Sequence, residues 1–168
     1  MNSQIADCKG AGQEGLLLAL STGLRETGWA VFQGSAVAAS GLVGLKIRRK
    51  VEPSVRIAHQ LDALSAVTSR WRAASVARSK PSGVNRDAPG LEKLDVSLRE
   101  WAECLGIPLF DYASQEVRSA VAGQPNASRD AQCYAIMHKL ELIGQGRATA
   151  EWEAIAVGYY HRTLGREK

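Results

Sequence analysis

The sequence has few cysteines and no long apolar run, and each shortage excludes a class of protein. The three cysteines, Cys8, Cys104 and Cys133, are odd in number and scattered, which fits neither a disulfide framework nor the spacing of zinc ligands. We therefore expect reduced thiols. The longest apolar runs, such as residues 16–20, fall far short of the ~20 residues that span a bilayer. A membrane-spanning protein is not expected.

The N-terminal residues, MNSQIADCKGAGQEG, lack the basic start and the long apolar centre of a secretory signal. Their glycines and polar side chains predict a flexible lead-in over residues 1–15, followed by a single domain over residues 16–168. With 45% hydrophobic and 23% charged residues, the chain of 168 residues has enough apolar side chain for one globular core. A cytoplasmic location is the expectation.

Positive charge is concentrated in one part of the chain, although the net charge is only +4. Residues 46–86 contain ten Lys or Arg and two acids, so this segment carries +8 and the remainder of the chain −4. Such concentration is typical of a protein that binds an anionic polymer such as DNA. A solvated basic face on a globular protein is the alternative interpretation.

The apolar pattern predicts an α/β fold that opens with three strands in an antiparallel meander. The predicted strands are residues 16–22, 28–33, 36–47, 74–78 and 107–112, and the predicted helices are 53–71, 91–105, 114–121, 127–140 and 148–163. The stretch SKPSGVNRDAPG, residues 79–90, is dense in turn-forming and charged residues and predicts an exposed, mobile loop.

Three stretches resemble the RuvC family of Holliday-junction resolvases. LALSTGLRETGWAVF (18–32) resembles the family's first hairpin, in which an aspartate, a small residue and Gly precede a short turn and a Thr-Gly-aromatic strand start. GIPLFDYASQEVRSAVAGQPNASRDAQCYAIM (106–137) resembles its Pro-apolar-Phe-acid-Tyr strand and the two helices that follow, and ATAEWEAIAVGYYH (148–161) resembles its final acidic helix. RIAHQLDAL (56–64) is similar to its first helix.

The resemblance covers about residues 16–163 and implies a ribonuclease H-like α/β fold. The expected sheet is mixed and five-stranded, with an antiparallel meander plus parallel strands, and is flanked by helices. It also implies a homodimer that acts on four-way DNA junctions. The helix predicted over residues 91–105, whose apolar stripe includes Trp101, matches a helix of the family's dimer interface, although such a stripe is also typical of a core.

Catalysis in that family depends on four acidic positions, because two divalent ions need several anionic oxygen ligands. Carried over by the resemblance, these positions fall on Ser21, on Arg78, near Ala148 and on Glu151, so three of the four lack an acid. We therefore expect a degenerate site that holds no metal and no other cofactor. The guanidinium of Arg78 is expected to replace part of the metal's charge and to hold a phosphate.

The resemblance also implies DNA contacts. Arg129 matches a basic position near the scissile phosphate, and Arg118 matches a basic position in the preceding helix. With members of the basic segment, they complete the expected DNA-binding set of Arg48, Arg49, Lys50, Arg78, Lys80, Arg118 and Arg129.

Three functions are compatible with these patterns. The favoured one is a catalytically inactive RuvC-like protein, a pseudo-nuclease that binds branched or double-stranded DNA as a homodimer. The alternative is a divergent Holliday-junction endonuclease that needs Mg or Mn and uses Glu151 with acids from loops, such as Glu26 or Asp87. A third, a protein-interaction scaffold, would not require the concentrated positive charge.

Overall fold

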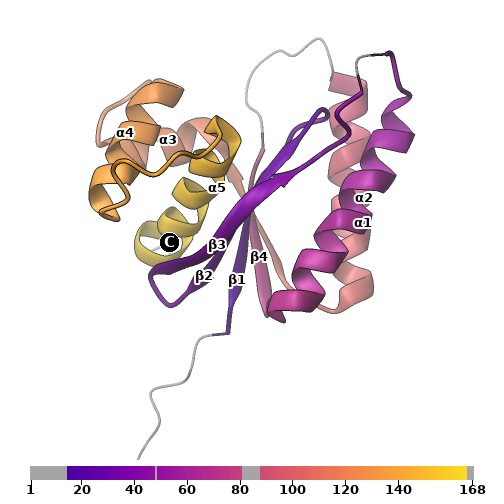
Figure 1. The fold of residues 1–168 in the computed structure, drawn as a ribbon, viewed down its shortest axis with the longest axis horizontal. Helices are drawn as coiled ribbons and strands as arrows, with labels where there is room; N and C mark the ends of the chain where they lie inside the picture. Colours follow the sequence, from indigo (N-terminus) through magenta and orange to yellow (C-terminus); the bar gives the residue numbers. More distant parts are fainter. Residues whose placement is uncertain (1–14, 48, 81–87, 166–168) are drawn as a thin grey trace, which may run out of the picture.

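A mixed five-stranded sheet forms the centre of the molecule, with the strand order β3-β2-β1-β4-β5 (Figure 1). The computed structural model describes residues 15–47, 49–80 and 88–165. The strands are β1 (Leu17–Ser21), β2 (Thr27–Gln33), β3 (Ala36–Val43), β4 (Ser75–Lys80) and β5 (Leu109–Ala113). β1, β2 and β3 form an antiparallel meander, and β4 and β5 continue the sheet parallel to β1. The predicted α/β fold class is confirmed.

Helices cover both faces of the sheet, in two layers that are separate in Figure 1. One layer is α1 (Pro53–Trp71) and α2 (Ala88–Leu105), and the other is α3 (Ser114–Ala122), α4 (Arg129–Lys139) and α5 (Thr149–Tyr159), which continues as a π-helical turn (Tyr160–Leu164). Pro53 begins α1, as predicted, because proline lacks the N–H that a first helical turn leaves unpaired.

Some predicted boundaries differ from the structure. β4 continues to Lys80 and α2 begins at Ala88, so the predicted loop over residues 79–90 is too long at both ends. Its centre, residues 81–87, lies outside the described residues, as do Arg48 and residues 1–14 of the predicted lead-in.

Side chains of β1 alternate between two cores because successive residues of a strand point to opposite faces. Leu17 and Ala19 lie in the core with α5, whereas Leu18 and Leu20 lie in the core with α1 and α2. By the same alternation, Ser21 at the end of β1 lies on the α5 side of the sheet.

The apolar stripe of α2 packs inside this chain. Leu94, Leu98 and Ala102 are at most 2% exposed and face the sheet. Trp101 joins the same core, and its Nε1–H donates a hydrogen bond to the Ser65 hydroxyl of α1 at 2.8 Å. The stripe that includes Trp101 is therefore core.

Close approach of α5 to β2 depends on two glycines. A Cβ at Gly28 would overlap the backbone carbonyl of Ala150, and a Cβ at Gly158 would overlap the ring of Phe32. Without side chains at these positions, α5 lies directly on the sheet. The first turns of α5 thereby reach the end of β1.

The cysteines and the helix lengths can be compared with the expectations from composition. Cys104 is exposed and Cys133 is buried, and both are free thiols, while Cys8 lies outside the described residues. Within the described ranges, no helix is both long enough and apolar enough to cross a membrane.

Candidate functional site

A polar cavity of about 190 Å³ lies where β1 and β4 end. Ser21 pairs in register with Ser79, and both side chains lie on the α5 side of the sheet. Thr22 follows β1 in the wall, and the helices of that layer supply further polar side chains, which are Ser114 and Arg118 from α3, Arg129 and Gln132 from α4, and Glu153 from α5. We call this hollow the serine cavity.

Glu153 is the acid that faces Ser21 in the serine cavity. The Ser21 hydroxyl donates to Glu153 Oε2 at 3.0 Å. The guanidinium of Arg129 donates from Nε to Oε1 at 2.5 Å and from Nη2 to Oε2 at 3.1 Å. The hydrogen bond to Glu153 raises the pKa of Arg129 from its ordinary value, against an opposing effect of burial. Glu153 is 8% exposed, and its carboxylate is paired with the permanently charged guanidinium of Arg129.

Glu151, predicted as the fourth acidic position, serves the helix end instead. Its carboxylate accepts the backbone N–H of Ala148 at 2.8 Å and the Ser40 hydroxyl at 3.1 Å. The sequence assignment in this helix was therefore two residues too early. Glu153, two positions further along, is the acid of this helix that contacts Ser21.

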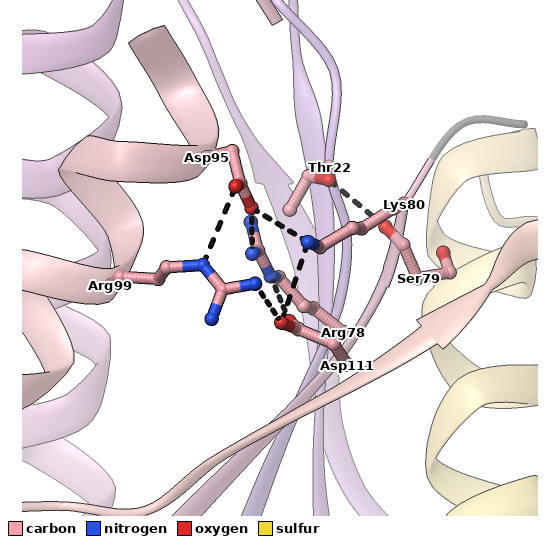
Figure 2. A network of polar contacts seen from close by, with 7 residues as sticks. All are labelled: Thr22, Arg78, Ser79, Lys80, Asp95, Arg99 and Asp111. Atoms are coloured by element: carbon pink, nitrogen blue, oxygen red, sulfur yellow. Dashed lines mark hydrogen bonds and ion pairs between the residues drawn. The ribbon is translucent and has the colours of Figure 1, made fainter. Parts of the chain in front are cut away.

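Arg78 lies on the opposite face of the sheet from Ser21, so it does not occupy the second acidic position. Its side chain is 1% exposed and contacts the carboxylates of Asp95 in α2 and Asp111 in β5, the latter at 2.5 Å (Figure 2). The strand residue on the correct face is Ser79, one position further along. A guanidinium that two carboxylates hold inside the protein is not free for a phosphate, which argues against the predicted contact between Arg78 and DNA.

Lys80 and Arg99 complete this group of charges, which we call the β4–α2 ion cluster. Lys80 Nζ lies 3.1 Å from Asp95 Oδ1, and Arg99 Nη2 lies 2.6 Å from Asp111 Oδ2 (Figure 2). Burial by itself would raise the pKa of Asp95, but the hydrogen bonds and charges of Arg78 and Lys80 outweigh it and lower this pKa from 3.8 to about 2. At Asp111, burial would likewise raise the pKa, but the hydrogen bond from Arg78 and the charges of Arg78, Lys80 and Arg99 outweigh it and lower this pKa. Both carboxylates are ionised at neutral pH.

Two buried side chains in the serine cavity have unused hydrogen-bonding groups. Gln132 is 3% exposed and Ser79 is 6% exposed. Within the described part of the chain, neither the Gln132 amide nor the Ser79 hydroxyl has a hydrogen-bond partner, although the Ser79 carbonyl accepts from Thr22 at 2.9 Å. Buried polar groups are normally paired, so these two are available to a bound molecule.

Comparison with solved structures places this fold. RuvC from Thermus thermophilus, solved in complex with a Holliday junction substrate, superposes with a TM-score of 0.73 over 89% of this chain and 96% of that one, at 18% identity. The chain has the RuvC fold. A second structure of Thermus thermophilus RuvC gives a TM-score of 0.71 at 18% identity, over 88% of this chain and 95% of the other. The yeast mitochondrial Holliday junction resolvase, Ydc2, gives 0.55 at 10% identity, over 90% and 85%.

Sequence comparisons add nothing to this likeness, because no family model matches the chain. The curated proteins also contain no match. At 18% identity the RuvC likeness establishes the fold and the order of its elements, so the chemistry of the site depends on the residues that this chain carries.

Those residues do not fit the pair of divalent ions that the RuvC resemblance implies. The positions at the ends of β1 and β4 are the hydroxyls Ser21 and Ser79, which are neutral and weak ligands for Mg²⁺. Among the described residues that line the cavity, the one carboxylate is that of Glu153, which Arg129 already neutralises. Over residues 15–47, 49–80 and 88–165, no three His, Cys, Asp or Glu side chains gather closely enough to hold a metal ion.

A second, larger hollow of about 830 Å³ lies between the β1–β2 turn and the segment that joins β3 to α1. Because β3 ends at the same edge of the sheet as β1, this hollow and the serine cavity share one edge, which we call the carboxyl edge. The second hollow is lined by five basic residues, and we call it the basic hollow. They are Arg25, Lys46, Arg49, Lys50 and Arg56. Among the described residues, no acid lines it.

The structure divides the predicted DNA-binding set into three groups. Arg118 and Arg129 meet in the serine cavity, and Arg49 and Lys50 are exposed at the basic hollow. Arg78 and Lys80 belong to the β4–α2 ion cluster, and Arg48 lies outside the described residues.

Two participants lie beyond the positions that the resemblance assigns, Ser79 one residue after Arg78 and Glu153 two residues after Glu151. Glu151 and Glu153, two residues apart on a helix, point to different faces and do not form one site. The alternation of β4 offered a signal for Ser79, since Ala77 and Ser79 share a face while Arg78 does not.

Proposed function

We propose that the protein binds DNA at the carboxyl edge of its sheet and does not cleave it with metal ions. The observation that carries this proposal is the charge of the serine cavity. A hydroxyl, Ser21, stands at the end of β1, and the retained acid, Glu153, is paired with Arg129. With Arg118 in the same wall, the cavity has a net positive charge. It favours an anion over a divalent cation.

The proposed ligand is branched or double-stranded DNA, with four-way junctions as the preferred form. Support comes from the RuvC fold, since the Thermus thermophilus protein was solved with a Holliday junction substrate, and from the cations that gather at the same edge. Phosphate contacts by Arg49 and Lys50 would add a largely sequence-independent attraction. The proposal requires no cofactor.

We further propose a homodimer, because the two-fold symmetry of a dimer matches a four-way junction. The outer surface of α1 and α2 carries an apolar groove lined by Ile57 and Leu61 from α1 and by Val96 from α2, which is 53% exposed. Since the inner stripe of α2 is core, a dimer contact on this helix would use its outer face.

A mobility-shift titration of a labelled four-way junction against linear duplex of the same length, in EDTA, tests the DNA proposal. We expect complexes with both DNAs and higher affinity for the junction, with two copies of the chain per junction. Failure to bind either DNA at low salt would contradict the proposal and favour the protein-interaction scaffold instead.

The divergent endonuclease keeps one observation in its favour, which is that an acid, Glu153, remains in the serine cavity. Two of its other candidate ligands are poorly placed for an ion shared with Glu153, since Glu151 is bound to the backbone of Ala148 and Glu26 is exposed on the β1–β2 turn. Asp87 lies outside the described residues. Among the described acids, a nuclease on this scaffold would depend on Glu153.

A further inference from the structure

We infer that the serine cavity is a metal-independent site for one phosphate group, bound by Ser79, Gln132, Arg118 and Arg129. The inference deepens the proposed function and rests on it for the source of the phosphate, which is a phosphodiester of bound DNA. Phosphate binding itself follows from the donors, charge and size of the cavity.

The Ser79 hydroxyl and the Gln132 amide are two polar groups that a phosphate can use. Ser79 and Gln132 come from different elements, β4 and α4, yet both border the serine cavity at less than a tenth exposure and without a side-chain partner among the described residues. Both side chains border an open cavity, where a bound phosphate oxygen replaces water as the acceptor of their hydrogen bonds. A hydroxyl and an amide N–H can both donate to one phosphate.

Arg118 and Arg129 also have N–H groups with no partner among the described residues. Arg129 uses Nε and Nη2 on Glu153, and its Nη1 has no partner among the residues described. Arg118 has one long contact, from Nη1 to Gln115 Oε1 at 3.5 Å, so most of its donors remain unused. Guanidinium groups bind phosphate oxygens through paired, charge-assisted hydrogen bonds.

Glu153 acts in this account as a positioning residue. It lies 8% exposed between Ser21 and Arg129 and accepts hydrogen bonds from both. Its charge cancels one arginine, which leaves +1 from the three charged residues that line the cavity in the described part of the chain. Arg129 is 57% exposed, so without this anchor its long side chain would be free to leave the cavity.

The serine cavity is small. Its volume of about 190 Å³ is smaller than the ~300 Å³ at which small-molecule pockets begin, which suits a small anion such as one phosphate group.

Inorganic phosphate is the probe for the first arm of the test. Thermal unfolding is followed in EDTA at constant ionic strength, with chloride replaced stepwise by phosphate. At phosphate about five times its Kd, we expect the wild-type Tm to rise by about 2–4 °C. Ser79→Ala and the isosteric Gln132→Glu should weaken phosphate binding by about tenfold or more, because each removes a donor or adds a negative charge.

Matched controls lie on exposed positions of α1, in the other helix layer. Ser69→Ala removes a hydroxyl, and Arg70→Gln removes a guanidinium, without touching the serine cavity. Arg118→Gln makes the same change as Arg70→Gln at a residue that lines the cavity. The controls should retain the wild-type response. No rise of Tm with phosphate, or an equal rise in Ser79→Ala, Gln132→Glu and Arg118→Gln, would overturn the inference.

The second arm identifies the source of the phosphate. At constant ionic strength, phosphate should compete with a labelled junction, and Ser79→Ala should weaken binding of that junction. If the variants lose inorganic phosphate but bind DNA as the wild type does, the assignment to a DNA phosphate is wrong. DNA binding without any phosphate response would reject the serine cavity and leave the proposed function standing.

Discussion

At the scale of single residues, the site depends on the exchange of carboxylates for hydroxyls. In the serine cavity, the Ser21 hydroxyl donates to Glu153, and Arg129 donates twice to the same carboxylate. Both oxygen atoms of the Glu153 carboxylate therefore already accept hydrogen bonds. Ser21 and Ser79 are neutral and Arg129 neutralises Glu153, so the described residues of the cavity favour an anion.

The pairing of Arg129 with Glu153 makes a prediction about stability. Arg129→Gln leaves a nearly buried carboxylate with only the Ser21 hydroxyl, so we expect the free energy of unfolding to fall by about 1–2 kcal/mol, a value reduced for the exposure of Arg129. Adding Glu153→Gln removes the unpaired charge and should recover most of the loss. Urea unfolding of the wild type, both single variants and the double variant measures the coupling. A double variant no more stable than Arg129→Gln would contradict this account.

The sequence predicted part of this site. Ser21, Arg118 and Arg129 were identified and lie together in the serine cavity. Ser79 and Glu153 were not assigned to it because matching a motif does not fix the face on which a side chain lies. In a strand a shift of one residue changes the face, which is why the fully buried Arg78 was assigned to a phosphate.

At the scale of elements, the β4–α2 ion cluster joins α2 to two strands of the sheet. Asp95 from α2 and Asp111 from β5 both contact Arg78, whose side chain is 1% exposed. Breaking a buried ion pair leaves an uncompensated charge, which is costly. The contact between this helix and the sheet should therefore depend on both carboxylates being ionised.

Stability should fall in acid because of these two carboxylates. The folded pKa of Asp95, about 2, lies below the ordinary value of 3.8, so the unfolded state binds a proton first as the pH drops. The contribution is complete above about pH 4 and is lost as the pH falls towards 2. Urea unfolding from pH 6 to pH 2 should show a smaller pH dependence in Asp95→Asn than in the wild type. Identical pH dependence in the two proteins would show that the ion cluster does not stabilise the fold.

The seat of α5 on β2 gives a second prediction at this scale. A methyl group at Gly28 would overlap the Ala150 carbonyl at the start of α5, so Gly28→Ala should destabilise the protein by about 1–3 kcal/mol. The displaced helix should also disturb the bond between Glu153 and Ser21. Gly146→Ala is the control, since a Cβ there meets nothing within 4 Å, and it should change stability by less than about 0.5 kcal/mol. Equal unfolding free energies for the two variants would refute the close approach.

At the scale of the whole molecule, the sequence predicted the order of strands and helices well. Regular alternation and helical spacing mark each element, and Pro53 marks the start of α1. The boundaries around β4 and α2 were wrong because charged and turn-forming residues continue into both elements, where tertiary contacts outweigh local preference. Arg25 was not identified because it reaches the basic hollow from a turn about twenty residues before the basic segment.

The charge of the carboxyl edge predicts a salt-dependent affinity for DNA. Each phosphate contact contributes about 0.9 to the slope of log K against log salt concentration. Arg49→Ala with Lys50→Ala should therefore lower that slope by about 2, measured by fluorescence anisotropy between about 50 and 200 mM salt. The control pair, Arg70→Ala with Lys139→Ala, removes the same charge near the far ends of α1 and α4 and should leave the slope unchanged. Equal slopes for both double variants would mean that the edge is not the binding surface.

Metal-independent binding of DNA by this RuvC fold can be measured together with strand cleavage. A labelled four-way junction is titrated at constant ionic strength in EDTA and in Mg²⁺ or Mn²⁺, and each reaction is resolved on native and denaturing gels. We predict binding that persists in EDTA and intact strands under every condition. Cleavage that requires the metal and is lost in Glu153→Gln would contradict the account and establish a divergent endonuclease.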